Sequence, residues 1–137
     1  MALECELVIE TGAPIPFTVA DATGIEKGAV LLLSDPMTAA TTTGDTDACA
    51  GIAAEEKVAS DGNVKLAAYR EGIFRGFAGA AGVTVGHTII TDTATGAANE
   101  LVNSDVNSEN LVGIALETAA DTESFLFELK PMGANLA

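Results

Sequence analysis

Few side chains in this sequence could act as nucleophiles, bases or metal ligands, and those few lie far apart. His87 is the only histidine. A catalytic triad or a histidine-rich metal site would need partner groups around it, so we interpret it as a polar residue at the start of a strand. Cys5 and Cys49 are too far apart for a CxxC motif. Glu4 and Glu6 should raise rather than lower the pKa of the Cys5 thiol, so neither cysteine is expected to be a nucleophile.

Acidic loop clusters are the next candidates for chemistry. Asp45-Thr46-Asp47 and Asp92-Thr93 offer the oxygen ligands that Ca²⁺ prefers, but the distal glutamate of an EF-hand is missing. Acidic loops are also expected in a chain this rich in Asp and Glu, so we favour solvated loops over a calcium site. The neighbouring carboxylates of Glu55 and Glu56 diverge along the chain and do not form an acid/base pair.

The glycines between Gly72 and Gly79 could be mistaken for a phosphate-binding loop. That stretch lacks a GK[ST] ending, a following helix and a nearby lysine. Turns and close backbone contacts explain these glycines better. We therefore expect no enzymatic activity, no cofactor and no metal.

The charge balance narrows the choice of partners. The 137 residues include 20 Asp and Glu against 6 Lys and Arg, for a net charge of −14. Nucleic-acid binding requires a basic surface and is excluded in practice. The acidity suits either adaptation to high salt, the slightly preferred interpretation, or ordinary solubility.

Neither a membrane segment nor a targeting signal is apparent. The longest apolar run, Ala29 to Leu33, is far shorter than the roughly 20 residues that cross a bilayer. The N-terminus has no basic region followed by an apolar core, so we expect synthesis and folding inside a cell, with both cysteines reduced.

Short apolar stretches separated by glycines and turn pairs such as Asp61-Gly62 predict an all-β protein with little or no helix. The stretch from Ala53 to Ala59 would form one helical turn at most. The expected strands are Leu3 to Glu10, Ala29 to Ser34, Val64 to Ala68, Thr88 to Thr91, Leu111 to Leu116 and Phe125 to Leu129.

The chain also contains a weak internal repeat. Ile25-Glu-Lys-Gly28-Ala-Val-Leu-Leu matches Val83-Thr-Val-Gly86-His-Thr-Ile-Ile, and Cys49-Ala-Gly-Ile-Ala matches Leu111-Val-Gly-Ile-Ala. The marker glycines lie 23 residues apart in the first copy (28 to 51) and 27 apart in the second (86 to 113). The copies therefore agree apart from a loop insertion, which indicates a duplication.

Two similar halves of about three strands each are too small to fold alone and should share one β-barrel, β-tulip or sandwich. The domain organisation that follows is an extended N-terminal arm over residues 1–17, one β domain over residues 18–130 and a tail over residues 131–137. Within the domain the repeat boundaries fall at about 18–76 and 77–130, joined through the small residues from Gly76 to Gly82.

Two segments are candidates for contact with partners. Prolines in the N-terminal arm favour an extended segment that lies along a partner surface. The second segment holds both arginines and two phenylalanines within eight residues, a composition typical of interface centres, although a core position for the phenylalanines is an equal alternative. The candidate partner contacts of the arm are Leu3, Leu7, Ile9, Pro14, Ile15, Pro16 and Phe17. The candidate subunit interface is Arg70, Phe74, Arg75 and Phe77.

These motifs, taken in order, resemble the decoration or cement proteins of tailed viruses with HK97-type capsids. Each motif is weak, and their order carries the resemblance, which spans roughly Phe17 to Lys130. The carrying segments are Ile25 to Val30, Cys49 to Ala53, Glu71 to Phe74, Ala80 to Gly86 and Leu111 to Ala115.

The resemblance implies a β-barrel or β-tulip subunit that forms a homotrimer on the virion, outside the capsid, after synthesis in the host cytoplasm. Its partner would be the major capsid protein of the same virus, which it would stabilise at junctions between capsomers. By the same analogy, residues 1–17 would contact the capsid, and the strand from Phe74 to Phe77 would contact sister subunits. The strong acidity departs from a typical member and fits a virus of a halophilic host.

Two other classes of protein are alternatives. A carbohydrate-binding or adhesion module is disfavoured because sugar platforms use exposed Trp or Tyr, and the chain has no Trp and only Tyr69. A small enzyme is disfavoured because no catalytic constellation is present.

Overall fold

The computed structural model describes residues 3–44, 47–93, 97–104 and 110–132, and in these ranges the chain is all β, without helix. The all-β class expected from the sequence is confirmed. No helix in the described ranges is long and apolar enough to cross a membrane. The strands are β1 (Glu6–Ile9), β2 (Ile15–Thr18), β3 (Val30–Asp35), β4 (Thr38–Thr41), β5 (Cys49–Ala53), β6 (Lys65–Tyr69), β7 (Gly72–Ala78), β8 (Thr88–Thr91), β9 (Glu100–Asn103), β10 (Leu111–Ala115) and β11 (Ser124–Met132).

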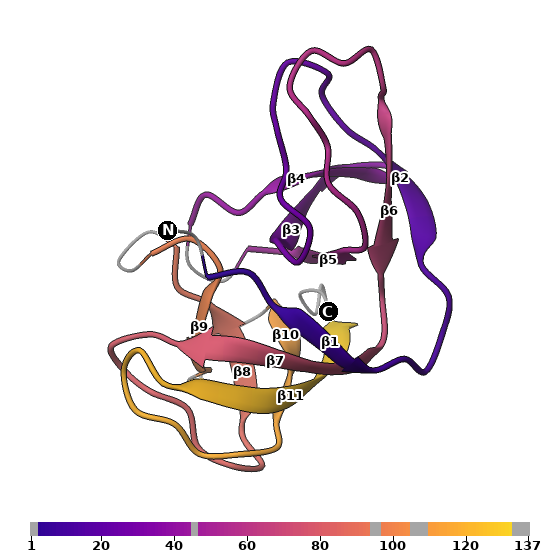
Figure 1. The fold of residues 1–137 in the computed structure, drawn as a ribbon. Helices are drawn as coiled ribbons and strands as arrows, with labels where there is room; N and C mark the ends of the chain where they lie inside the picture. Colours follow the sequence, from indigo (N-terminus) through magenta and orange to yellow (C-terminus); the bar gives the residue numbers. More distant parts are fainter. Residues whose placement is uncertain (1–2, 45–46, 94–96, 105–109, 133–137) are drawn as a thin grey trace, which may run out of the picture.

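The first half of the chain closes a five-stranded barrel in the order β2-β4-β3-β5-β6, in the upper part of Figure 1. Four of its pairings are antiparallel. The fifth, between β2 and β4, is parallel and is reduced to the pair Thr18 and Thr38. Closure leaves no free sheet edge in this unit, which protects it from strand-to-strand aggregation.

The second half repeats this arrangement. Its strands follow the order β7-β11-β10-β8-β9, and a parallel pairing between β7 and β9 joins the two ends of that run. Strand β1 is added antiparallel to β7, with Leu7 opposite Phe74. Each half therefore contributes five strands and encloses its own interior, instead of three strands to a shared barrel.

Matching backbone contacts support the duplication. Ile25 forms a bridge with Lys57 in the first barrel, and Val83 forms the corresponding bridge with Ala119 in the second. The loops that carry these bridges project from opposite ends of the molecule in Figure 1.

The N-terminal residues do not form the extended arm that the prolines suggested. Strand β1 pairs with the second barrel, and β2 is a wall strand of the first. Pro16 is tolerated in β2 because its partner Ala67 makes its hydrogen bonds elsewhere. The Ala67 amide donates to the Glu55 carboxylate, and the Ala67 carbonyl accepts from the Ala54 amide. The expected tail is also shorter, because β11 extends to Met132, and residues 133–137 lie outside the described ranges.

Each barrel has its own core, and the two cores meet. The second is aromatic: Phe74 and Phe127 stack with ring centroids 6.1 Å apart, and Phe125 packs at 5.6 Å from Phe127. Val30, Cys49 and Ile52 of the first barrel belong to this same cluster. The first barrel is filled by smaller side chains around Phe17, Leu31 and Leu66.

Candidate interaction surface

The outward side of the sheet formed by β1, β7 and β11 is the strongest candidate for a contact surface. Along β7 buried and half-buried residues alternate, so Gly72, Phe74, Gly76 and Ala78 face the core while the residues between them face out. Residues directly opposite in neighbouring strands share a face. We define the outer face by Ile9, Ile73, Arg75, Phe77 and Leu126, and the same pairings place Glu6, Ser124 and Glu128 on it as well.

The outer face combines a cation with half-exposed apolar side chains. Arg75 lies between Glu6 of β1 and Leu126 of β11, and its guanidinium is 3.5 Å from the Ser124 hydroxyl. Ile9 is 55% exposed and Phe77 is half-buried. Three residues singled out from the sequence, Ile9, Arg75 and Phe77, are thus brought together on one face.

Two other members of the candidate subunit interface have internal roles. Phe74 is buried in the aromatic core, where its ring also lies 5.8 Å from that of Tyr69. The Arg70 guanidinium donates to the carbonyls of Cys49 (3.1 Å) and Ala50 (3.0 Å). Arg70 therefore satisfies carbonyls of β5 from within the chain.

The remaining candidates from the N-terminal segment divide by burial. Ile15 and Pro16 are exposed, whereas Leu3, Leu7 and Pro14 are half-buried. Leu7 packs against the second core. Phe17 is only 2% exposed and lies in the first core, so its side chain is not on the surface.

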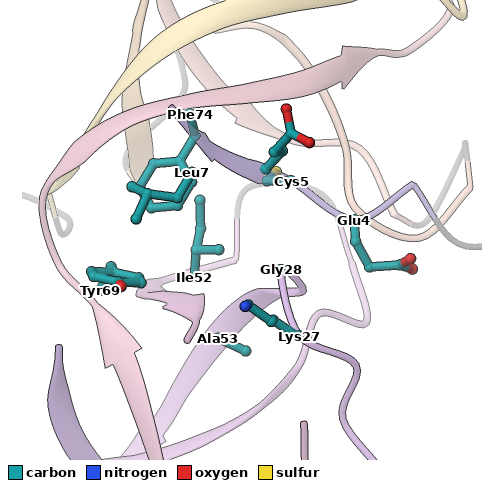
Figure 2. A pocket seen from close by; sticks show the side chains of 10 residues that line it. Glu4, Cys5, Leu7, Lys27, Gly28, Ile52, Ala53, Tyr69 and Phe74 are labelled. Carbon is teal, nitrogen blue, oxygen red and sulfur yellow. The ribbon is translucent and has the colours of Figure 1, made fainter. Parts of the chain in front are cut away.

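A groove of about 570 Å³ lies between the barrels beside the N-terminal segment (Figure 2). Its apolar side is formed by Leu7, Ile52, Tyr69 and Phe74. The charged residues of the lining are Glu4, Glu6 and Lys27.

Sequence reasoning did not single out Lys57, which holds the projecting loops of the first barrel together. Its ammonium donates to the carboxylates of Asp21 (3.0 Å) and Asp61 (2.7 Å) and to the carbonyls of Asp21 and Val58. Burial lowers the pKa of Lys57, but hydrogen bonds to Asp61 and Asp21 outweigh that effect and raise it overall. The hydrogen bond from Lys57 holds the pKa of Asp61 below its ordinary value.

The potentially reactive groups lie in separate places. Both thiols are buried and unpaired with each other, and burial raises the pKa of Cys5 and of Cys49 to about 12. His87 is exposed beside Gly86. The described ranges contain no group of three or more side chains that could hold a metal ion.

The acidic loops are organised by hydrogen bonds. The Asp47 carboxylate accepts from the amides of Thr43 (2.8 Å) and Gly44 (3.0 Å), which caps its own loop. The Asp47 amide in turn donates to the hydroxyl of Thr91 at 3.0 Å, and this contact ties the loop to the second barrel. Asp45 and Thr46 of the calcium hypothesis lie outside the described ranges.

The chain has known relatives in sequence and in fold. A family model described as phage cement protein matches residues 9–129. The solved structure of the head fiber gp8.5 N base in bacteriophage phi29 has a similar fold, with a TM-score of 0.56 and 14% identity over 89% of this chain and 98% of that one. No curated protein sequence matches the chain.

Proposed function

Because the chain belongs to the phage cement protein family and has a capsid-decoration role in the virion, we propose that it binds the outside of the shell and strengthens it. Its partner is the major capsid protein of the same virus, bound at junctions between capsomers. The observation that carries this proposal is the family match over most of the chain. The fold, with its two cores and its half-apolar outer face, is consistent with that role.

The outer face is proposed as the contact between sister subunits of a homotrimer. Arg and aromatic side chains are enriched at interface centres. This face holds Phe77 and Arg75, which is one of the two arginines in the chain. Arg75 also offsets local acidity where copies with a net charge of −14 must meet. Added salt is expected to favour the trimer by screening that repulsion.

The exposed residues Ile15 and Pro16 of β2 are proposed to contact the shell, whereas Ile9 lies on the outer face and belongs to the proposed subunit contact. Contact area from many copies would supply the stabilisation without a catalytic step. The chain would be made in the host cytoplasm, where the buried thiols stay reduced.

Light scattering tests the subunit contact. Purified wild type is expected to have three times the 13.8 kDa chain mass in molar salt. Phe77→Ser should reduce that mass toward the monomer. Val64→Ser, which removes an exposed apolar side chain at the opposite barrel, should leave the trimer intact. A wild-type monomer at every salt concentration would rule out the homotrimer.

A further inference from the structure

The glycine corner that precedes β8 in the second barrel is a copy of the corner that precedes β3 in the first. Gly28 precedes β3 with φ +90°, and Gly86 precedes β8 with φ +86°. Their amides donate to the carbonyls of Ala53 (2.9 Å) and Ala115 (2.8 Å), respectively. The two corners therefore have the same backbone conformation and the same internal hydrogen bond.

The first corner is covered by the N-terminal segment. The Cys5 amide donates to the Gly28 carbonyl at 2.8 Å, and the Cys5 carbonyl occupies the space that a Cβ on Gly28 would need. Figure 2 shows the segment at Glu4 and Cys5 passing beside Gly28. Gly28 and the following Ala29 are buried as a result.

The second corner is bare within the described ranges. Nothing lies within 4 Å of the position of a Cβ on Gly86, and none of the described donors binds the Gly86 carbonyl. Gly86 and His87 are exposed. The loops after β7 and β10 turn at the bottom of Figure 1, on the side of the second barrel that faces away from the first.

Two exposed apolar side chains flank the bare corner, next to the polar side chains of Thr84, His87 and Glu117. Val85 is 56% exposed and Leu116 is 42% exposed. At the covered corner the corresponding positions hold Lys27 and Ala54, which follows from aligning the marker glycines and the Gly-Ile-Ala segments. An exposed apolar pair beside an accessible carbonyl offers both packing and hydrogen bonding to an extended peptide.

We propose that Val85, Gly86, His87 and Leu116 bind an extended segment of the capsid shell protein. The segment donates a backbone N–H to the Gly86 carbonyl, as Cys5 does to Gly28, and packs an apolar side chain against Val85 and Leu116. The inference rests on the proposed function, because it takes the shell as the partner.

A second copy of the chain fits this corner less well. The segment of a sister subunit that has the required shape is already bound at its own Gly28. Each copy also carries a net charge of −14, and exposed Glu117 adjoins Leu116. A contact between two copies would therefore bring like charges together at the corner.

Co-sedimentation with shells that lack this protein, prepared from the virus that encodes it, tests the inference. The variant Val85→Ser with Leu116→Ser should bind at least about tenfold more weakly than wild type, the loss expected when an apolar anchor is removed. Its mass by light scattering should equal that of wild type. The control Val58→Ser with Val64→Ser removes two exposed apolar side chains from the first barrel and should bind normally.

Unchanged shell affinity of the corner variant would overturn the inference, and so would a reduced oligomeric mass, which would place a second copy at the corner. If wild type itself failed to bind shells, the decoration proposal would fail first. Hydrogen exchange gives an independent readout: amides of residues 84–88 should exchange more slowly on the shell, while those of residues 57–62 should not. No slowing at residues 84–88 would also overturn it.

Discussion

The ammonium of Lys57 lies 2.7 Å from the carboxylate of Asp61, although the Lys57 side chain is completely buried. A buried charge is tolerated only when it is paired and hydrogen-bonded, and Lys57 has four such contacts. The corresponding residue of the second barrel is Ala119, which forms the same backbone bridge without any charge. The projecting loops of the two barrels thus share the same backbone bridge, but within the described ranges a buried ion pair stabilises the loops of the first barrel alone.

Lys57→Met is expected to destabilise the protein because it leaves the carboxylates of Asp21 and Asp61 without their shared cation. Lys65→Met is the matched control, since among the described residues the exposed Lys65 ammonium donates only to the Thr18 hydroxyl. Thermal unfolding should show a clearly lower Tm for the first variant than for the second. Equal Tm values would show that the buried ammonium does not stabilise the loops.

The Lys57 and Asp61 pair should give a defined pH dependence. The pKa of Asp61 is below its ordinary value of 3.8 in the folded state, so its contribution is present above pH 3.8 and is lost as the pH falls through the folded pKa. The pKa of Lys57 is above 10.5, so its contribution is lost only as the pH rises beyond that value. The difference in unfolding free energy between wild type and Asp61→Asn, measured by denaturant titration, should be constant near neutrality and shrink below about pH 4. A difference that grew in acid would contradict this assignment.

The duplicated glycines of β5 and β10 should both be intolerant of a side chain, and Gly51 also has a φ of +141° that disfavours one. A Cβ at Gly51 would collide with the Tyr69 carbonyl, and one at Gly113 with the Glu128 carbonyl. Gly51→Ala and Gly113→Ala are each expected to cost roughly 3 kcal/mol in denaturant titrations. Gly62→Ala should cost only about 1 kcal/mol, because Gly62 has positive φ but no atom within 4 Å of the Cβ position. A harmless Gly113→Ala would mean that the close approach of β10 and β11 is not rigid.

The thiols should be inert in the folded protein. Burial raises the pKa of Cys5 and Cys49 to about 12, so almost no thiolate is present at pH 8. Alkylation by iodoacetamide, followed by mass spectrometry, should be at least ~100-fold slower in buffer than in denaturant, because it requires unfolding. Fast labelling of either cysteine in buffer would contradict the buried positions.

Two phenylalanines on opposite sides of β7 should separate stability from assembly. Phe74→Ala removes a ring from the aromatic core and should cost about 3–5 kcal/mol of unfolding free energy. Phe77→Ala lies on the outer face and should cost far less while reducing the oligomeric mass. Denaturant titration and light scattering on the same two variants check both outcomes. A large loss of unfolding free energy in Phe77→Ala, with unchanged oligomeric mass, would show that Phe77 is a core residue.

Much of the fold could be predicted because its strands carry clear patterns. The expected strands correspond to β1, β3, β6, β8, β10 and β11, where apolar alternation or buried runs are strong. Strand β2 was interpreted as part of an arm because of its prolines. Strands β4 and β9 were not anticipated because they are short and lack alternation, with sequences Thr38-Ala-Ala-Thr and Glu100-Leu-Val-Asn. These are the strands whose parallel pairings close the barrels, so closure depends on tertiary contacts that local sequence does not encode.

The contact residues could be predicted only in part. Composition indicated the segment from Arg70 to Phe77, but composition does not say which side chains point outward. The alternation of β7 held that information: Gly76 and Ala78 share the side of Phe74, and small residues leave room for a packed ring. Lys57 was not predicted to be buried because a lysine in an acidic loop is usually solvated. The one indication of burial was that the corresponding residue of the second repeat is an alanine, Ala119.

The most direct test of the decoration role is to add purified protein to shells that lack it and count the bound copies by electron cryomicroscopy. We predict saturable binding on the outer surface, with a fixed number of copies per shell and a higher temperature of shell disruption at saturation. Shells that remained bare at saturating protein concentration, or that bound copies without gaining stability, would contradict the account.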